Sequence, residues 1–324
     1  MKFKAAVVGL GKIGQGYDYD CHDESLITTH ASAYHFHPSF DLVAGMDLNT
    51  MSCLAFEKKY KAQTFNCLDE MMETLNPDVI SIAVSTNIHY EIFNKIISYY
   101  PKAILLEKPI AVSVNQAQDM VSAAGNAGIP LIVNYIRRFE PGTNKLKEMI
   151  SNGVIGDIYK GIVWYGKGLK NNGSHFIDIL MYLFGKVKNI HLISRGRNFD
   201  ALGYEDAEPD FQLEFCDTII LFQSTRSECF SLTEFALIGT KGTIFYNDDR
   251  IEYRLTKNDP FNKGYTKLQE EPDRIKTYFE RYQYFVVDSL SGFLKKQTTI
   301  NSDGNSALET LKIVQKILSL RERF

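Results

Sequence analysis

Two short polar segments of the sequence carry side chains suited to proton chemistry. The first is Glu107-Lys108-Pro109, which directly follows an apolar run at residues 103–106. A lysine beside a proline at a strand end is a cation held at a fixed place. It can bind a hydroxyl group and lower the pKa of that group, or donate a proton to a carbonyl. Alternatively, Lys108 is an ordinary loop residue that forms an ion pair with Glu107. Composition alone favours neither role.

The second segment contains His175, near the start of an apolar helix expected over about residues 172–184. Imidazole has an unperturbed pKa of about 6.5, which suits proton transfer at neutral pH. On a helix, Asn171 lies four residues before His175 and on the same face, so a polar neighbour is available to fix the imidazole tautomer. A capping or packing role for His175 is the alternative.

The first residues carry a pattern that is typical of dinucleotide binding. Residues 3–8 are an apolar run of strand length, and G-x-G-x-x-G follows at once as Gly9-Leu10-Gly11-Lys12-Ile13-Gly14. In this pattern Gly9 allows the tight turn, Gly11 lets the backbone approach a pyrophosphate, and Gly14 lets a helix pack closely on the strand. The first N–H groups of that helix would then hold the diphosphate.

An acid at the end of the second apolar run indicates which dinucleotide binds. Asp47 closes the run at residues 40–46, where a carboxylate accepts hydrogen bonds from the ribose hydroxyls and repels a 2′-phosphate. We therefore expect NAD, with NADP disfavoured. Asp47 lies further from Gly14 than the usual gap of about twenty residues. The polar stretch 16–29 accounts for the excess as a loop inserted before a short helix from about His30. Alternatively, Asp47 merely ends the strand in a turn and contacts no ribose.

A parallel sheet is the element that would position these residues. Residues 1–135 alternate apolar runs and amphipathic helices with short connections, which predicts a doubly wound α/β Rossmann domain. Ligands bind at the carboxyl ends of the strands of such a sheet. Cofactor contacts are therefore expected just after three successive strands, from Ser85, Thr86, Asn87, His89, Glu107, Lys108 and Asn134.

Residues 136–324 follow a different pattern and are expected to form a second domain of the α+β class. Residues 210–215 alternate strictly between apolar and polar, and the runs up to residue 246 continue in this style, which predicts a large, mainly antiparallel sheet. Two helices, over about 274–293 and 305–321, close the chain. We expect substrate contacts from Lys108, Arg138, Tyr165, Lys167, Asn171 and His175; a solvated charged loop is the alternative for the lysines and Arg138.

Helices on one face of that sheet would leave its other face uncovered. A second copy of the chain is the simplest cover, so we expect a homodimer or homotetramer formed through the C-terminal sheet.

Bulk properties argue against several classes of protein. The 324-residue chain has a formal net charge of −3 and no Lys/Arg run, which argues against nucleic-acid binding. No apolar stretch reaches the length of a membrane span. The five cysteines form no C-x-x-C pair, so neither a metal site nor a disulfide framework is expected. The chain opens directly on its first strand, without a leader pattern, and we expect a cytoplasmic protein.

In this order, the motifs resemble those of the Gfo/Idh/MocA oxidoreductases, the glucose–fructose oxidoreductase and inositol dehydrogenase family. The segments that carry the resemblance are Gly9 to Gly14, residues 85–89, Glu107-Lys108-Pro109, residues 134–141, residues 173–178 and the turn at 239–243. The resemblance implies an NAD(P)-dependent dehydrogenase for a hydroxyl of a sugar, polyol or nucleotide sugar. It implies that Lys108 orients this hydroxyl and that His175 takes its proton while hydride moves to the nicotinamide. Members of the family often have a cis peptide before this proline, so the resemblance also implies a cis Lys108–Pro109 peptide.

One departure from the family pattern keeps alternatives open. Asn171 stands where the family commonly has an aspartate, and an amide can orient an imidazole but cannot stabilise an imidazolium by charge. A dinucleotide-binding regulator or sensor without turnover is therefore one alternative. A reductase of an imine or double bond, with Lys108 or His175 as the proton donor, is the other.

Overall fold

The chain divides into two compact units. The computed structural model describes residues 2–200 and 205–324. Unit 1 comprises Met1–Phe139 and Glu280–Leu311, and unit 2 comprises Glu140–Phe279 and Lys312–Phe324. The predicted division at residue 135 differs from this arrangement, because residues 280–311 belong to unit 1 and not to the second domain.

Unit 1 is built on a six-stranded parallel sheet with the order β3-β2-β1-β4-β5-β6. Strand order reverses between β1 and β4, and at such a point an open α/β sheet binds its ligand. This topology confirms the predicted doubly wound fold. The strands are β1 (Phe3–Val8), β2 (Phe40–Met46), β3 (Gln63–Phe65), β4 (Val79–Ile82), β5 (Ala103–Leu106) and β6 (Leu131–Val133).

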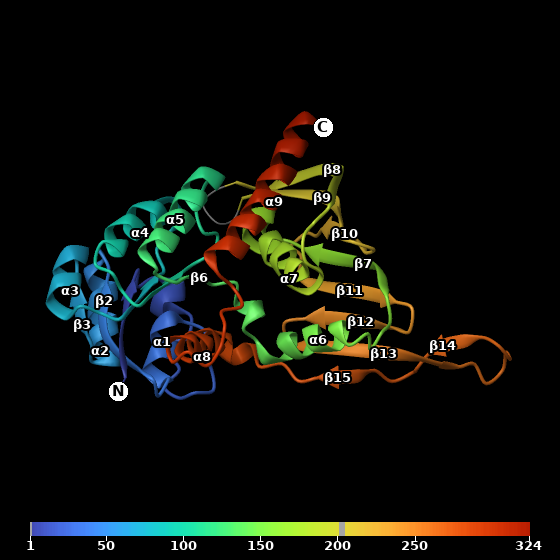
Figure 1. Cartoon of the computed structure of the whole chain (residues 1–324), viewed down its shortest axis with the longest axis horizontal. Helices are drawn as coiled ribbons and strands as arrows, with labels where there is room; N and C mark the ends of the chain where they lie inside the picture. Colours follow the sequence, from blue (N-terminus) through green and yellow to red (C-terminus); the bar gives the residue numbers. More distant parts are fainter. Residues whose placement is uncertain (1, 201–204) are drawn as a thin grey trace. The chain divides into compact units, whose positions relative to one another are not determined.

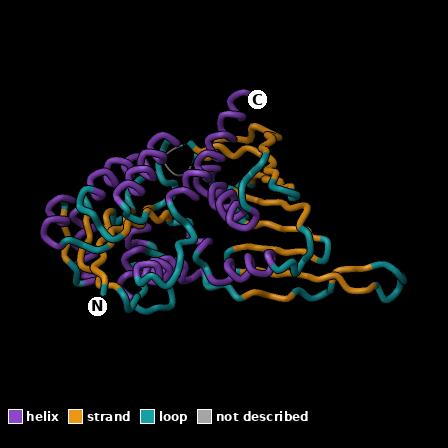
Figure 2. Tube along the Cα trace, viewed as in Figure 1, coloured by secondary structure: helices purple, strands orange, loops and turns teal. Residues whose placement is uncertain are grey.

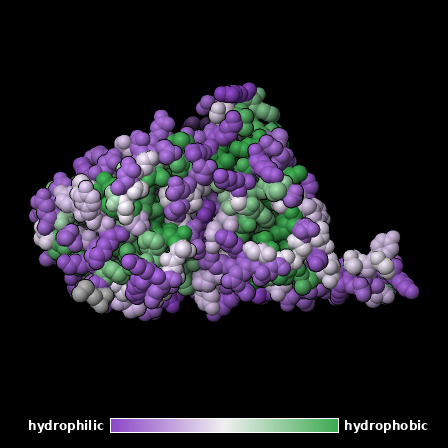
Figure 3. Space-filling model, viewed as in Figure 1, coloured by the Kyte–Doolittle hydropathy of each residue, from purple (hydrophilic) through white to green (hydrophobic). Residues whose placement is uncertain are grey.

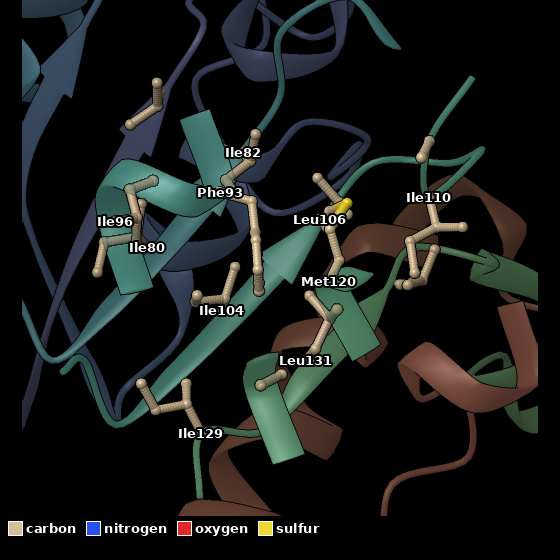
Figure 4. Close-up of a cluster of buried hydrophobic side chains, with 14 of the residues drawn as sticks. Ile80, Ile82, Phe93, Ile96, Ile104, Leu106, Ile110, Met120, Ile129 and Leu131 are labelled. Carbon is tan, nitrogen blue, oxygen red and sulfur yellow. The ribbon is translucent and has the colours of Figure 1, made fainter. Parts of the chain in front are cut away.

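Helices cover both faces of this sheet (Figure 1). On one face, Phe93 and Met120 pack against Ile80, Ile82 and Ile104 of β4 and β5 (Figure 4). These strands are apolar at every position except Ser81, because both of their faces are buried. The helices are α1 (His30–Phe36), α2 (Thr50–Tyr60), α3 (Leu68–Leu75), α4 (His89–Ile97), α5 (Val114–Ala127), α8 (Tyr282–Leu294) and the first part of α9 (Gly304–Arg323).

Helix α8 is the reason that the C-terminal segment belongs to unit 1. Its Val286, Val287 and Leu290 are buried in one hydrophobic cluster with Ala5 and Val7 of β1. The amphipathic pattern of α8 reveals that one of its faces is buried, but it does not reveal which core receives that face. The helix expected over 274–293 begins only at Tyr282, because residues 273–275 form a strand instead.

Unit 2 contains a nine-stranded sheet in which, among the described residues, every hydrogen-bonded pair of strands is antiparallel except β7 and β10. This confirms the predicted, mainly antiparallel sheet. Its elements are α6 (Pro141–Ser151), β7 (Ile158–Tyr165), α7 (Ser174–Phe184), β8 (Asn189–Phe199), β9 (Asp206–Glu214), β10 (Ile219–Ser224), β11 (Glu234–Gly239), β12 (Gly242–Asn247), β13 (Arg250–Asn258), β14 (Thr266–Leu268) and β15 (Asp273–Ile275).

The two faces of this sheet differ in burial. Val163, Phe235 and Tyr246 are neighbours across β7, β11 and β12, and all three are buried in the cluster that includes residues of α7. On the opposite face the pleat places Ile162 and Ala236 side by side, and both are only partly buried. Strict alternation in the sequence arises from this difference between the faces.

The two units differ in secondary structure and in the hydropathy of the surface residues. Strands predominate in unit 2, where β13 and β14 form a long hairpin (Figure 2). In the face drawn in Figure 3, hydrophobic residues gather mainly over the strands of unit 2, and hydrophilic residues predominate over α2 to α5 of unit 1. Within residues 2–200 and 205–324, no helix combines the length and the apolar character that crossing a bilayer requires.

Candidate functional site

The glycine loop after β1 has the steric properties that the fingerprint predicts. Gly9 has φ +97°, and a Cβ there would lie 2.6 Å from the carbonyl carbon and oxygen of Ala83. A Cβ on Gly14 would overlap the carbonyl oxygen of Gly9, whereas a Cβ on Gly11 would meet nothing within 4 Å. Gly9 and Gly14 are therefore required by the packing of the loop. Gly11 faces open space, which fits the close approach of a diphosphate.

The element after this loop differs from the helix that the pattern predicts. Lys12–Gly16 forms one short π-helical turn, in which Gly16 N–H donates to the carbonyl oxygen of Gly11 at 3.1 Å. Lys12 is exposed and Ile13 is partly buried. The polar residues that follow do not continue a helix, so α1 begins only at His30, as expected for an inserted loop.

The inserted loop is held firmly within unit 1. The buried carboxylate of Asp18 accepts hydrogen bonds from the backbone N–H groups of Thr28 and Thr29, at 2.8 and 3.0 Å. Lys59 of α2 donates to the carbonyl oxygen of Asp18 at 2.7 Å. Tyr282 of α8 donates to the carbonyl oxygen of Thr28 at 2.9 Å. The loop therefore links α1, α2 and α8.

Asp47 lies against the glycine loop in spite of the insertion. Its Oδ2 accepts a hydrogen bond from the Leu10 N–H at 2.7 Å, and its Oδ1 accepts one from the Asn49 N–H at 2.8 Å. These bonds fix the plane of the carboxylate at the carboxyl end of β2. The acid therefore lies directly beside the fingerprint loop.

Of the residues expected after β4, three line a turn and one is buried. Thr86–Ile88 forms a 3-10 turn, in which Asn87 is exposed and Thr86 partly buried, and the preceding Ser85 is exposed. His89 is buried, with Nδ1 3.1 Å from the Pro109 carbonyl oxygen and Nε2 3.1 Å from the Val84 carbonyl oxygen. Burial lowers the pKa of His89. His89 therefore joins the loops after β4 and β5.

The segment after β5 carries a buried acid and a half-buried lysine. Glu107 Oε1 lies 2.9 Å from His30 Nε2 and also accepts a hydrogen bond from Asn134 Nδ2. Glu107 Oε2 accepts one from the Lys108 N–H at 3.3 Å. The Lys108–Pro109 peptide is cis, as the resemblance implied. The structure thus brings together two predicted residues, Glu107 and Asn134, and adds His30, which the sequence did not single out.

Two further polar residues at this position were missed. Ser81 Oγ lies 3.1 Å from His30 Nδ1, and Gln283 Oε1 accepts a hydrogen bond from Asn134 Nδ2 at 3.0 Å. Both are fully buried. Ser81 is the one polar residue within β4, and that was an available signal. Gln283 offered none, since only the return of α8 to unit 1 brings it here.

The segment before His175 is anchored by two buried acids of β9. Asp206 accepts hydrogen bonds from the N–H groups of Lys170 and Asn171, at 3.1 and 3.0 Å, and Glu208 accepts one from the Gly168 N–H at 3.1 Å. Burial raises the pKa of Asp206, although the two backbone N–H groups oppose this shift. The sequence analysis missed both acids because β9 is distant in the chain.

The backbone here is not the continuous α-helix that the sequence predicts. Gly168–Gly173 is π-helical, and α7 begins at Ser174, so Asn171 and His175 do not lie on one α-helix. Lys167 precedes this turn with φ +60°, and both Lys167 and His175 are partly buried.

Tyr165 and Arg138, both expected substrate contacts, lie inside their units. Tyr165 is fully buried, and its hydroxyl donates to the Pro209 carbonyl oxygen at 2.5 Å. This placement favours a packing role for Tyr165 over substrate contact. Arg138 is also buried and donates to the Asn301 carbonyl oxygen at 3.1 Å. Among the described residues, no group of three or more His, Cys, Asp or Glu side chains is arranged to hold a metal ion.

Comparison with known proteins supports the interpretation of unit 1. Residues 3–135 match a family model described as "Oxidoreductase family, NAD-binding Rossmann fold". D-glucoside 3-dehydrogenase of Escherichia coli (strain K12) is 27% identical over 203 residues, which cover 56% of this chain and 54% of that protein. The galactose/lactose metabolism regulatory protein GAL80 of Saccharomyces cerevisiae is 29% identical over 154 residues, 39% of this chain and 35% of that protein. The chain thus spans about half or less of the length of these two relatives.

A solved structure shares the fold over nearly the whole chain. The WlbA dehydrogenase from Bordetella pertussis, in complex with NADH and UDP-GlcNAcA, superposes with a TM-score of 0.77 at 20% identity. The superposition covers 99% of this chain and 96% of that chain. At this identity the likeness concerns the fold alone.

Proposed function

We propose that this chain is an NAD-dependent dehydrogenase of the Gfo/Idh/MocA family of oxidoreductases, whose Rossmann-fold model matches residues 3–135. It transfers hydride between a hydroxyl-bearing carbon of a sugar, polyol or nucleotide sugar and the nicotinamide. The observation that carries this proposal is the geometry of unit 1. There a sterically required glycine loop, an acid bonded to that loop and the Glu107-Lys108 segment all lie at the carboxyl ends of one parallel sheet.

The residues of unit 1 fit a dinucleotide. Gly11 leaves the space that a diphosphate needs, and Asp47 presents a carboxylate that bonds ribose hydroxyls and repels a 2′-phosphate. The proposed cofactor contacts are completed by Lys12, Ile13, Ser85, Thr86, Asn87 and Asn134. His89 holds the loops after β4 and β5 together through the carbonyl oxygens of Val84 and Pro109. When bound, the nicotinamide supplies the acceptor or the donor of the hydride.

Lys108 and His175 carry the proton chemistry in this proposal. The Lys108 ammonium binds the substrate hydroxyl, orients it and lowers its pKa. His175 takes the hydroxyl proton during oxidation and returns it during reduction. Arg138, Lys167 and Asn171 are the proposed further substrate contacts. The names of the glucoside dehydrogenase and of the complex with a nucleotide sugar support a sugar substrate.

The test is spectrophotometric. NAD+ or NADP+ is mixed with a panel of sugars, polyols and nucleotide sugars, and absorbance of the reduced nicotinamide is followed. Lys108→Met and His175→Asn should each lower kcat by about a hundredfold or more, the size of a lost general acid or base, while the Kd for NAD+ stays within about threefold.

Matched controls are the exposed Lys102→Met and His191→Asn, which should keep full activity. Retained turnover in both active-site variants would show that other residues carry the chemistry.

A regulator that binds the dinucleotide without turnover is the second candidate. Asn171 favours it because an amide cannot stabilise an imidazolium by charge, and the match to a regulatory protein supports it. Under this hypothesis NAD binds tightly, yet its redox state never changes with any substrate on the panel. Consumption of NADH only with imines or activated double bonds would instead identify a reductase.

A further inference from the structure

Four buried polar side chains form a closed ring beside Lys108. They come from four segments of unit 1: His30 from α1, Glu107 after β5, Asn134 after β6, and Gln283 from α8. His30 Nε2 lies 2.9 Å from Glu107 Oε1, and Asn134 Nδ2 also bonds this oxygen. Asn134 Nδ2 lies 3.0 Å from Gln283 Oε1, and Gln283 Nε2 lies 3.4 Å from His30 Nδ1, which closes the ring.

The ring has only one consistent direction of donation when Glu107 is ionised. A carboxylate oxygen can only accept, so Asn134 must turn its NH2 group toward Glu107. The same NH2 group donates to Gln283 Oε1, which leaves the NH2 group of Gln283 facing His30 Nδ1. An amide NH2 can only donate, so Nδ1 must be the accepting nitrogen. The proton on His30 Nε2 therefore points at Glu107.

Glu107 is the anionic member of this ring. Burial by itself disfavours its charged form, but the hydrogen bonds of His30 and Asn134 and the electrostatic interactions with His30 and Lys108 outweigh burial, and the pKa of Glu107 lies below its usual value. The other titratable groups that act on this carboxylate are His89 and Tyr282. A buried carboxylate is stable only with such donors, so the ring serves to keep an anion in a fixed place.

This anion lies on the nicotinamide side of the proposed cofactor site. Asp47, the proposed ribose contact, ends β2, on one side of the reversal between β1 and β4. Glu107 follows β5, on the other side of that reversal. A dinucleotide that crosses the reversal with its adenosine end at β2 brings its nicotinamide end toward β4, β5 and β6. Asn134 Oδ1 is buried without a hydrogen-bond partner, and it is an acceptor suited to a carboxamide N–H.

We propose that this ring sets the redox preference of the cofactor site, that is, how much more tightly the site binds NAD+ than NADH. Glu107 is the fixed anion, and His30, Asn134 and Gln283 are its positioning residues. Oxidised nicotinamide carries a positive charge that reduced nicotinamide lacks, so a fixed anion binds NAD+ more strongly than the same site without the charge. The ring thereby raises the occupancy of the site by NAD+ relative to NADH. This inference rests on the proposed function, because it requires a nicotinamide cofactor.

The decisive quantity is the ratio of the dissociation constants of NADH and NAD+, measured by calorimetry on the full-length protein. Glu107→Gln removes the charge and keeps the size of the side chain. We expect it to lower the preference for NAD+ about tenfold, equivalent to about 1.4 kcal/mol. Affinity for ADP-ribose, which lacks the nicotinamide, should stay within about twofold of the wild-type value.

Glu140→Gln is the matched control. Glu140 is a fully buried carboxylate of unit 2 that accepts hydrogen bonds from three backbone N–H groups, those of Gly142, Thr143 and Tyr278. Its neutralisation perturbs folding in a similar way, but it should leave the NADH to NAD+ ratio unchanged.

A second variant separates charge from structure through its pH profile. The wild-type ratio should stay constant between about pH 6 and pH 9, because Glu107 remains ionised. In His30→Ala the carboxylate loses a donor and its pKa rises, so the preference for NAD+ should fall as the pH is lowered toward 6. If Glu107→Gln does not fold, this pH profile still tests whether the charge of Glu107 sets the preference for NAD+ over NADH.

The outcomes are distinguishable. If both nucleotides bind Glu107→Gln with the wild-type ratio, or if Glu140→Gln changes the ratio equally, the ring does not set the redox preference. A flat pH profile in His30→Ala would overturn the role of His30. If wild-type protein binds neither NAD+ nor NADH, the proposed function itself is wrong.

Discussion

The carboxylate of Asp47 shows how much can be predicted for a single residue from its place at the end of a strand. Its position at the end of an apolar run indicated a ribose contact, and the structure places both of its oxygens in hydrogen bonds, one of them to the glycine loop. Such motif residues are predictable because local sequence fixes their place on the strand. His30 and Gln283 were not predictable, since residues so distant in the chain meet only when the fold is complete.

Selectivity for NAD is the prediction that belongs to Asp47. Asp47→Asn keeps an oxygen that accepts from the Leu10 N–H but removes the charge that repels a 2′-phosphate. The preference for NAD+ over NADP+ should therefore fall about tenfold, as expected for one charge near a phosphate. Titration of both nucleotides measures the ratio.

Asp41→Asn, at the exposed opposite end of β2, serves as the control for this substitution. An unchanged ratio in Asp47→Asn would mean that another group selects the cofactor.

Most strands and helices could be predicted from the period of apolar residues, but the two π-helical turns could not. Lys12–Gly16 stands where the start of an ordinary helix was expected, and Gly168–Gly173 directly precedes and overlaps the start of the helix expected from about residue 172. The second turn is held by Asp206 and Glu208, which bond its backbone N–H groups. The conformation therefore depends on a strand far away in the sequence, and the local pattern of apolar residues contains no sign of it.

Gly168→Ala tests this turn. Gly168 has φ +88°, and a Cβ would overlap the side chain of Asp206. Gly264 has the same φ of +88° but open space within 4 Å, so Gly264→Ala reports the backbone strain alone. We expect a loss of about 3 kcal/mol in the free energy of unfolding for Gly168→Ala and of about 1 kcal/mol for Gly264→Ala.

Urea denaturation measures both losses, and Gly168→Ala should also raise the KM for the substrate. Equal losses in the two variants would show that Asp206 does not restrict the turn.

At the scale of the whole molecule, the open face of the sheet in unit 2 bears on assembly. Leu221, Ile162, Ala236 and Phe245 are successive neighbours across β10, β7, β11 and β12, and all four are only partly buried. An apolar row across four strands is unusual on a surface exposed to water. We propose that a second copy of the chain covers this row.

Leu221→Asp should therefore shift the protein to smaller species in sedimentation velocity, because a buried carboxylate disrupts an apolar interface. Leu54→Asp, on the exposed surface of α2, should leave the sedimentation coefficient unchanged. A wild-type protein that sediments as a monomer would contradict the proposed assembly.

The interrupted path of the chain through unit 1 affects how the protein is made. Translation delivers residues 1–139 first, but α8, which covers one face of their sheet, leaves the ribosome only after all of β7 to β15. Until then Ala5 and Val7 lack the part of their cluster that α8 supplies, and unit 1 remains incomplete. A premature stop between residues 140 and 279 would consequently leave both units incomplete, including the unit whose sheet had already been synthesised.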